Sequence, residues 1–463
     1  MPKPSPHGCA CRSISDEGGG ERRDQNVSET RKFGPIVLAE GYKPLNAFGV
    51  LLGGFSIIPL LAFMGLIMPT LLKEVFQIDP AFHGRMTGNL GVLQEVIVIA
   101  LMGVVGAASD NFGRRVIMVV GLCLVGLGLL VYPLAENELQ IYGYRAVFAL
   151  GAATAPIMYG ASMQDTPANR SRGQFIGFGS IATGGGVIVM GLTIARLPEY
   201  LVGRGVTPED AGIYTCWCMV AFAAVVAAMV RLTWRAGRAA ASEPREPIRR
   251  NLGQGFTGAV RNPRIALAYL TSFASRGDLV VILTFLSLWV VQDGWDAGLT
   301  TAEGTRRAGV MIAAINGVGL LVAVFIGRIV DRVNRVLAVC IAFAVAGGAY
   351  LGMALVADPY LNISLVACVF VGIGEISVII TGNALLGQEA PKARRGAVVG
   401  VFGLIGAFSI LCTNYFGGIV FDTISRVAPF VMMGIVNLVV ALVALYVLIR
   451  APGMSAKEVR TST

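Results

Sequence analysis

The chain contains little charge and almost no histidine, and both scarcities narrow its possible functions. Only 14% of its 463 residues are Asp, Glu, Lys or Arg, and two are histidines. With 55% hydrophobic residues and a mean hydropathy of +0.70, this composition is unlike that of a soluble domain. The sequence has no cluster of ligands at metal spacing and no Gly-x-x-x-x-Gly-Lys-Ser/Thr loop for ATP. We therefore expect no enzyme activity, no cofactor, no metal and no direct use of ATP.

The eight cysteines do not form a disulfide framework. Six of them lie within long apolar runs, where we expect them to pack as small hydrophobic side chains. His7, Cys9 and Cys11 are soft ligands that could bind zinc or copper(I), but three ligands on a polar tail are more simply unstructured chain. The net charge of +9 does not indicate nucleic-acid binding, because Lys and Arg are confined to short segments between apolar runs.

Long hydrophobic runs, in contrast, are abundant. A bilayer core of about 30 Å needs about 20 apolar residues per helix. The runs therefore predict an all-α membrane protein with twelve transmembrane helices. The predicted spans are 46–72, 88–109, 116–135, 141–163, 174–197, 212–232, 264–291, 308–328, 335–357, 360–385, 397–421 and 428–449.

Polar segments divide the chain into five parts. Residues 1–45 are rich in Pro, Gly and Ser, which predicts a disordered cytoplasmic tail. No short apolar segment with a cleavage site precedes the first long run, so we expect no cleaved signal peptide. The remaining parts are a six-helix bundle over 46–232, a cytoplasmic connector over 233–263, a second six-helix bundle over 264–449 and a cytoplasmic tail over 450–463.

Positive charge predicts the orientation of the spans. Of the 37 Lys and Arg residues, 28 lie on the side of the two tails and seven on the other side, while Arg145 and Arg276 lie within spans. Because cytoplasmic loops carry the excess of Lys and Arg, both termini should be cytoplasmic. We expect a multi-pass protein of the plasma membrane, which is the inner membrane if the source is bacterial.

A short polar motif separates the second and third runs and recurs in the second half of the chain. In the first copy, Gly106 allows close helix packing and Gly113 permits a tight turn. The second copy lies 221 residues later, and Arg85 and Arg306 have the same offset. These repeats predict two similar six-helix bundles around a central cavity. The motif positions are Gly106, Asp110, Gly113, Arg114 and Arg115, and then Gly327, Asp331, Arg332 and Arg335.

This motif resembles the signature loop of the major facilitator superfamily of secondary transporters, Gly-x-x-x-Asp-x-x-Gly-Arg-Arg. The resemblance covers about residues 45 to 450 and implies two six-helix bundles that rock about a central site, usually in a monomer. Asn111 replaces the usual Arg or Lys, and Asn334 replaces the second glycine of the later copy. In the family, the Asp of this loop faces the eleventh span. The resemblance therefore implies a conformational latch made by the motif residues of both copies.

Two further motifs are incomplete matches to the family. Arg145 opens Arg-Ala-Val-Phe-Ala-Leu-Gly-Ala-Ala, which resembles the family's Arg-x-x-Gln-Gly-x-Gly-Ala-Ala motif, in which the Arg is linked to proton coupling. Phe148 and Ala149 replace the Gln and the first Gly, and the alternative is an Arg that reaches the membrane interface. The fifth span has Gly184 to Gly186 without the proline of drug exporters, so a multidrug antiporter is not favoured over a symporter.

Several ionisable residues lie deep within spans, where a charge costs about 2.5 to 3.5 kcal/mol. Arg276 and Asp278 point about 200° apart on a regular helix and cannot neutralise each other. Either each has a partner on another span or Gly277 breaks the helix. We expect Arg276 to bind a carboxylate or phosphate and Glu95 or Glu375 to carry a proton, and structural ion pairs are the alternative. The candidate pathway residues are Glu95, Arg145, Arg276, Asp278, Glu375 and Asn383.

Together these features predict a secondary active transporter. The chain should move a small anionic or zwitterionic organic solute, coupled to protons, by alternating access. An efflux antiporter for drugs or metabolites remains an alternative. A non-transporting sensor or scaffold of the same fold, with the tail as its binding arm, is another. The expected partners are the solute, protons and the lipid bilayer.

Overall fold

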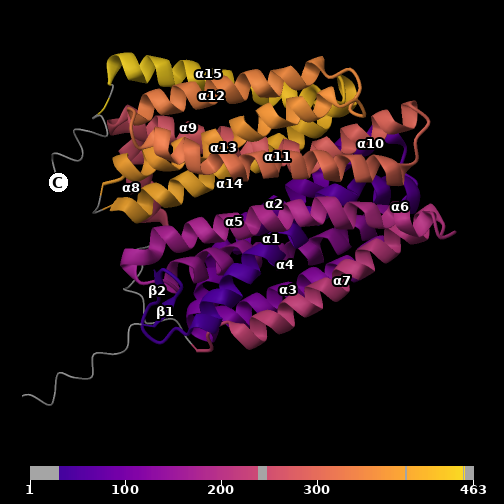
Figure 1. Cartoon of the computed structure of the whole chain (residues 1–463), viewed down its shortest axis with the longest axis horizontal. Coiled ribbons are helices and arrows are strands. Elements are labelled where there is room, and N and C mark those ends of the chain that lie inside the picture. The colour runs from indigo at the N-terminus through magenta and orange to yellow at the C-terminus, as the bar shows by residue number, and fades with distance from the viewer. Residues whose placement is uncertain (1–30, 238–247, 392–393, 452, 454–463) are drawn as a thin grey trace, which may run out of the picture.

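The computed structural model describes residues 31–237, 248–391, 394–451 and 453. Within these residues, twelve helices are long and apolar enough to cross a membrane. The predicted fold class, an all-α membrane protein with twelve spans, is therefore confirmed. Figure 1 shows the helices side by side in two groups, one from each half of the chain.

The first half contributes six spans. The first and fifth are composite, because a π-helical turn or a 3-10 turn and a short helix extend them. Two short strands precede the first span. The elements are β1 (Lys32–Phe33), β2 (Ile36–Val37), α1 (Pro44–Thr70), η1 (Leu71–Val75), η2 (Pro80–Phe82), α2 (His83–Phe112), α3 (Arg114–Val131), η3 (Tyr132–Leu134), α4 (Glu138–Asp165), η4 (Asn169–Ser171), α5 (Arg172–Thr193), η5 (Ile194–Arg196), α6 (Leu197–Val202) and α7 (Pro208–Thr233).

The second half contributes the other six spans, after a helix in the connector. Its first span is also composite, since a π-helical turn joins α9 to α10. The elements are α8 (Ile248–Arg261), α9 (Pro263–Val280), η6 (Val281–Phe285), α10 (Leu286–Asp296), α11 (Thr301–Val330), α12 (Arg335–Gly352), η7 (Met353–Leu355), α13 (Ile363–Glu389), α14 (Arg395–Thr423) and α15 (Ala428–Arg450).

The two copies of the motif loop make their turns with different residues. Gly113 joins α2 to α3 with a φ of 87°, a conformation that side chains with a Cβ rarely adopt. At the corresponding turn before α12, the side chain of Asn334 accepts hydrogen bonds from the backbone N–H groups of Val336 and Leu337. The asparagine that departs from the motif is therefore a helix N-cap.

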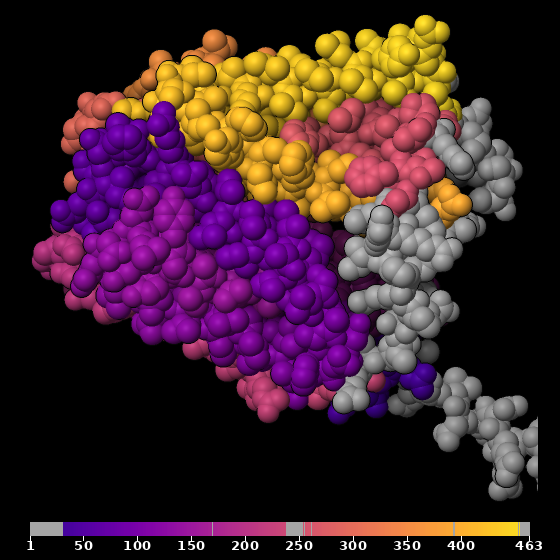
Figure 2. Space-filling model, turned by 180° about the vertical axis from the view of Figure 1, so that it is seen from behind, coloured from indigo at the N-terminus to yellow at the C-terminus, as the bar shows by residue number. Residues whose placement is uncertain are grey.

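The two bundles converge at one end of the molecule and diverge at the other. We call the end that holds β1, β2 and α8 the terminal face, and the other end the distal face (Figure 1). A Cβ at Gly88 of α2 would collide with the Asn414 carbonyl of α14 near the distal face, whereas a Cβ at Gly400 of α14 would meet nothing within 4 Å. Figure 2 shows the two halves in direct contact along this distal seam.

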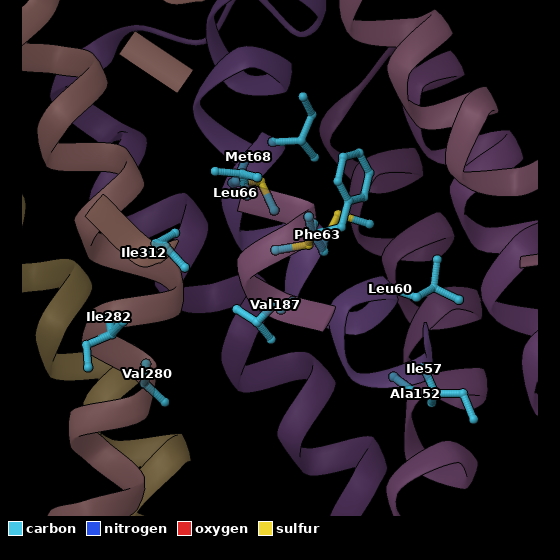
Figure 3. Close-up of a cluster of buried hydrophobic side chains, with 14 of the residues drawn as sticks. Ile57, Leu60, Phe63, Leu66, Met68, Ala152, Val187, Val280, Ile282 and Ile312 are labelled. Carbon is cyan, nitrogen blue, oxygen red and sulfur yellow. The ribbon is translucent and has the colours of Figure 1, made fainter. Parts of the chain in front are cut away.

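An apolar core continues across the distal part of the interface. Figure 3 shows Leu60 and Phe63 of α1 in the same cluster as Ile282 of the second half. Ser287 of α10 also donates a 2.8 Å hydrogen bond to the backbone carbonyl of Gly65 in α1. Because lipid tails are as apolar as these side chains, close van der Waals packing and interhelical hydrogen bonds stabilise the contact between the bundles here.

The segment predicted as a disordered tail is ordered over its last residues. Residues 31–43 form a strap that lies against the loop between α4 and α5: Val37 N–H donates to Ser171 Oγ at 3.1 Å, and Ala39 N–H donates to the Thr166 carbonyl. Ile36 is buried in the core, and Arg235 stacks over the ring of Tyr42 at 4.7 Å. Burial, and next the Asp165 carboxylate, raise the pKa of Tyr42. Residues 1–30 lie outside the described chain.

The connector contains a helix that the sequence analysis did not predict. Gly255 of α8 packs against Val401 of α14, and its carbonyl accepts a 3.0 Å hydrogen bond from Tyr269 Oη. The large side chains of Phe256 and Val260 are exposed. Hydrophobicity alone missed this helix because its sequence alternates arginine, glycine and single apolar residues.

Candidate functional site

Three of the predicted pathway residues lie near one another, midway along their spans. Glu95 lies on α2, Arg276 on α9 and Glu375 on α13. The guanidinium of Arg276 interacts electrostatically with both carboxylates, although Glu95 belongs to the other bundle. Glu95 and Glu375 are buried, while Arg276 is exposed. Arg276 is therefore a cation shared between acids on opposite sides of the interface.

The path of the Arg276 side chain is set by its neighbours on α14. A Cβ at Gly406 would lie 2.8 Å from Cγ of Arg276, so only a glycine leaves room for the side chain to cross this helix. One turn earlier on α9, Ser272 Oγ donates a 2.8 Å hydrogen bond to the Phe402 carbonyl. These contacts hold α9 against α14 and direct the guanidinium toward the interface.

Asp278 lies in a second polar group, inside the C-terminal bundle. Its Oδ1 accepts a 2.8 Å hydrogen bond from Nδ2 of Asn437 on α15. Tyr350 on α12 donates to Glu375 Oε2 at 3.2 Å and interacts electrostatically with Asp278. Asp278 also interacts with Glu375. Two carboxyl groups, an amide and a phenol from four helices therefore form one buried group.

The structure answers the question raised by the spacing of Arg276 and Asp278. α9 continues through both residues to Val280, so Gly277 does not break the helix. Each charged residue has partners on other spans, as the first alternative proposed. Gly277 instead allows close packing, because a Cβ there would lie 2.6 Å from the terminal methyl of Met433. The helix is interrupted only after Val280, by the π-helical turn η6.

Two other predicted residues lie apart from this central group. Arg145 is buried in the N-terminal bundle against the rings of Phe148, at 5.1 Å, and Tyr132, at 6.0 Å. Its Nε and one terminal nitrogen have no hydrogen-bond partner among the described residues. Asn383 is exposed on α13 and donates to the carbonyl of Ile379. Among the described residues, the ring contacts of Arg145 and the hydrogen bond of Asn383 do not involve Arg276.

The predicted latch residues lie at the terminal face, where the bundles diverge. Arg114 forms a 2.6 Å ion pair with Asp165 of its own bundle, and Arg335 contacts Asp331 at 3.4 Å. Arg115 donates to the carbonyl of Arg231. Arg332 is exposed, and a Cβ at Gly327 would meet nothing within 4 Å. The Gly106 carbonyl accepts a hydrogen bond from the Ser109 hydroxyl. These contacts all lie within a single bundle.

The distal face is closed by a seam between α2 and α14. Asp422 accepts hydrogen bonds of 2.8 Å from the backbone N–H groups of Gly84 and Arg85, and its side chain is only 3% exposed. The guanidinium of Arg85 lies 3.9 Å from the same carboxylate. Asp422 therefore caps the start of α2 from the other bundle, where the helix dipole favours a negative charge.

A second seam, between α11 and the composite fifth span, repeats this arrangement. Arg306 forms a 2.9 Å ion pair with Glu199, and a Cβ at Gly309 would collide with the carbonyl of Gly191. Arg306 and Gly309 follow Arg85 and Gly88 by 221 residues, while Glu199 and Gly191 precede Asp422 and Asn414 by 223. The contacts between the bundles thus have the same internal symmetry as the sequence.

A pocket of about 800 Å³ opens elsewhere, at the distal face of the N-terminal bundle. It lies within one bundle, between α2, α4 and α7, and Arg85 forms part of its wall. Glu95, Arg276 and Glu375 do not line it. We therefore place the candidate site at the charged group between the bundles.

Sequence reasoning missed Tyr350, Asn437 and Asp422. Asn437 could have been found, because an amide within the apolar run of α15 needs a partner in the membrane. Asp422 could have been found from its offset of 223 residues from Glu199. Tyr350 gave no signal, since a tyrosine in a span is common near an interface.

Comparisons with known proteins agree with this fold. The family model for the Major Facilitator Superfamily matches residues 50–412. The magnetosome protein MamZ of Paramagnetospirillum magneticum (strain ATCC 700264 / AMB-1) is 26% identical over 82% of this chain, and the match spans 59% of the length of MamZ. The magnetosome protein MamH of the same organism is 23% identical over 83% of this chain, and the match spans 88% of the length of MamH. A solved structure of a mutant nucleoside transporter, NupG, has a TM-score of 0.69 at 11% identity and covers 86% of this chain and 99% of its own. The chain belongs to the Major Facilitator Superfamily of secondary transporters.

Proposed function

We propose that this transporter moves a small organic anion or zwitterion in symport with protons. The observation that carries the proposal is the position of Arg276, which interacts with Glu95 of one bundle and Glu375 of the other. A guanidinium presents a planar set of N–H donors that suits carboxylate or phosphate. An ionisable residue at membrane depth is retained where it serves a function.

In the proposed mechanism, solute and proton binding are coupled through Arg276. A carboxylate or phosphate of the solute takes the guanidinium away from Glu95. The Glu95 carboxylate then lacks a cation in a poorly solvated site, where holding the charge is unfavourable, and it binds a proton. Glu95 suits the role of proton carrier better than Glu375. Its electrostatic attraction to Arg276 acts between the two bundles, so loss of that attraction also weakens the interface.

The conformational cycle follows from the two ends of the interface. The two bundles are joined at the distal seams and diverge toward the terminal face (Figure 1). We propose that the latch residues of both motif copies, Asp110 with Arg114 and Asp331 with Arg335, stabilise the opposite state, in which the terminal face closes. Arg145, buried in the N-terminal bundle, and Asn383, on the approach along α13, are proposed to tune the proton step and the solute path.

We further propose that the terminal face is cytoplasmic and that the protein works as a monomer in the plasma membrane. The excess of Lys and Arg on this side supports the orientation. The relatives MamZ and MamH are named magnetosome proteins, so a magnetosome membrane is the second candidate location. A fluorescent fusion with a membrane stain distinguishes these locations.

Uptake into vesicles with an imposed pH gradient tests the function. A panel of radiolabelled organic anions and zwitterions is screened first, and the active solute is then used with variants. Arg276→Ala should abolish accumulation of the solute, whereas Arg328→Ala, which removes an exposed arginine of α11, should not. Glu95→Gln should retain exchange of solute across the membrane and lose accumulation driven by the pH gradient.

Two outcomes would overturn the proposal. If no solute in the panel depends on Arg276, the charge assigned to the solute is wrong. If Glu95→Gln combined with Glu375→Gln still accumulates solute fully, proton coupling is wrong. Removal of residues 1–30, which leaves the strap at 31–43 intact, separates a transporter from a scaffold that needs the tail: a transporter should keep most of its flux.

A further inference from the structure

The four buried polar side chains inside the C-terminal bundle have unfilled hydrogen-bonding capacity. Asp278 and Asn437 are fully buried and Glu375 is 8% exposed. Among the described residues, nothing hydrogen-bonds to Asp278 Oδ2, Glu375 Oε1 or Asn437 Oδ1. An unsatisfied buried polar atom costs about 1 to 3 kcal/mol, and more if it is charged. Three such oxygens in one buried group can bind a cation or a proton.

The other polar atoms of these side chains already form hydrogen bonds, which fix the positions of the three oxygens. Asn437 Nδ2 donates both to Asp278 Oδ1 and to the carbonyl of Met433. Tyr350 uses its hydroxyl proton for Glu375 Oε2, so its oxygen keeps a lone pair. The unfilled atoms are therefore all acceptors, and they come from α9, α13 and α15.

The helices that carry these oxygens are packed closely enough to hold them in place. A Cβ at Gly374, next to Glu375, would lie 2.8 Å from Cα of Ala346 on α12. The adjacent turn of α13 is equally close to α11, since a Cβ at Gly372 would collide with the carbonyl of Ile315. The group is therefore held by closely packed helices at membrane depth.

We propose that Asp278, Glu375, Asn437 and the phenol of Tyr350 form a binding site for a sodium ion. Oxygen atoms from carboxylates and amides are the ligands that hard cations prefer. The charge is also suitable. The carboxylates of Glu95, Asp278 and Glu375 and the guanidinium of Arg276 leave two net negative charges. The proton that Glu95 binds in the proposed mechanism neutralises one of them, and one monovalent cation neutralises the other.

The number of free oxygens favours sodium over a proton. A single proton shared by the two carboxyl groups would satisfy Asp278 Oδ2 and Glu375 Oε1 and leave Asn437 Oδ1 unpaired, whereas a cation coordinates all three. A transition metal fits poorly, because the described residues contain no group of three or more His, Cys, Asp or Glu side chains that could hold one. The inference extends the proposed function by adding a second ion near the Arg276 site.

Equilibrium binding of radiolabelled sodium to the purified full chain in lipid nanodiscs tests the site, with choline replacing sodium at constant ionic strength. Wild-type protein should bind about one sodium ion, and unlabelled sodium should compete better than potassium. Asp278→Asn should abolish binding. Asn437→Ala and Tyr350→Phe should weaken it by about 10- to 100-fold. Asn316→Ala, which removes an amide of α11 that donates to the Ile312 carbonyl of its own helix, should bind sodium normally.

The outcomes separate this inference from the proposed function. Saturable sodium binding that survives in Glu95→Gln but is lost in Asp278→Asn supports a site distinct from the proton carrier. Absence of sodium binding by the wild-type protein overturns the inference, and pH-driven uptake can still occur in that case. Equal binding in the wild-type protein and Asp278→Asn, with both eluting as monodisperse particles, would also overturn it. Stronger competition by magnesium or manganese than by sodium would show that the ion is misassigned.

Discussion

Replacing Asp422 with asparagine should open the distal seam far more than any other loss of a charge there. Asp422 accepts two backbone hydrogen bonds from α2 and is almost fully buried. An asparagine can accept one of them, but its amide group then faces the other N–H. Loss of one hydrogen bond to a charged group costs about 1.5 to 3 kcal/mol. The equilibrium between closed and open distal faces should therefore shift by roughly 10- to 150-fold.

Amide hydrogen exchange measures this shift directly. Exchange of the Gly84 and Arg85 amides, which donate to Asp422, requires the seam to open. Their exchange rate should therefore rise by the same factor in Asp422→Asn when opening and closing are fast. The matched variant is Glu199→Gln in the second seam. The Glu199 side chain is 37% exposed and forms an ion pair with Arg306, which contributes about 1 kcal/mol or less. Exchange should therefore rise at most about 5-fold in Glu199→Gln.

The result that would refute this reasoning is equal exchange in the two variants. It would mean that the buried cap on α2 contributes no more to closure than an exposed ion pair. Faster exchange across the whole chain in Asp422→Asn would indicate global unfolding instead, so residues 335–352 of α12, far from the seam, serve as the internal reference.

Three further predictions follow from other contacts. Gly88→Val should prevent closure of the distal face, because its Cβ would collide with the Asn414 carbonyl, whereas Gly400→Val should be tolerated. Hydrogen exchange of the Gly84 and Arg85 amides distinguishes the two variants, and equal exchange would contradict the packing described. Asn334→Ala should lower the free energy of unfolding by about 1 kcal/mol through loss of the α12 cap, as measured by chemical denaturation, and Asn334→Asp should not. The pKa of Tyr42 is raised in the docked strap, so docking should be constant below the usual tyrosine pKa of about 10 and weaken as pH rises through the raised value. Limited proteolysis with subtilisin from pH 7 to 11 should show this release, and Tyr42→Phe should remove it.

The features predicted from the sequence depend on local composition or on repetition. The spans follow from apolar runs longer than the bilayer core, and the tight turn at Gly113 follows from a residue without a Cβ. The pairing of Arg276 with acids on other spans also follows, because residues two apart on a helix cannot neutralise each other. Each of these arguments needs only one segment of chain at a time.

The features that were missed depend on which spans are neighbours. Asn437 and Tyr350 lie 159 and 72 residues from Asp278 in sequence, and single polar residues in apolar spans do not reveal their partners. The strap at 31–43 was assigned to disorder because its composition is polar, yet it is fixed by backbone hydrogen bonds to a loop that follows α4. The strap is ordered although it contains no long apolar run, so hydropathy along the sequence could not predict its docking.

The two distal seams are related by sequence duplication but are unequal in strength. This inequality decides which seam separates first. The α2–α14 seam is fastened by a buried carboxylate on a helix end, whereas the α5–α11 side relies on a pair that water can reach. Separation should therefore begin on the α5–α11 flank and swing about the α2–α14 flank. A gap between the bundles would then open first toward the lipid beside α5 and α11. A solute with an apolar tail would enter from that flank of the protein, although the two halves of the chain are related by duplication.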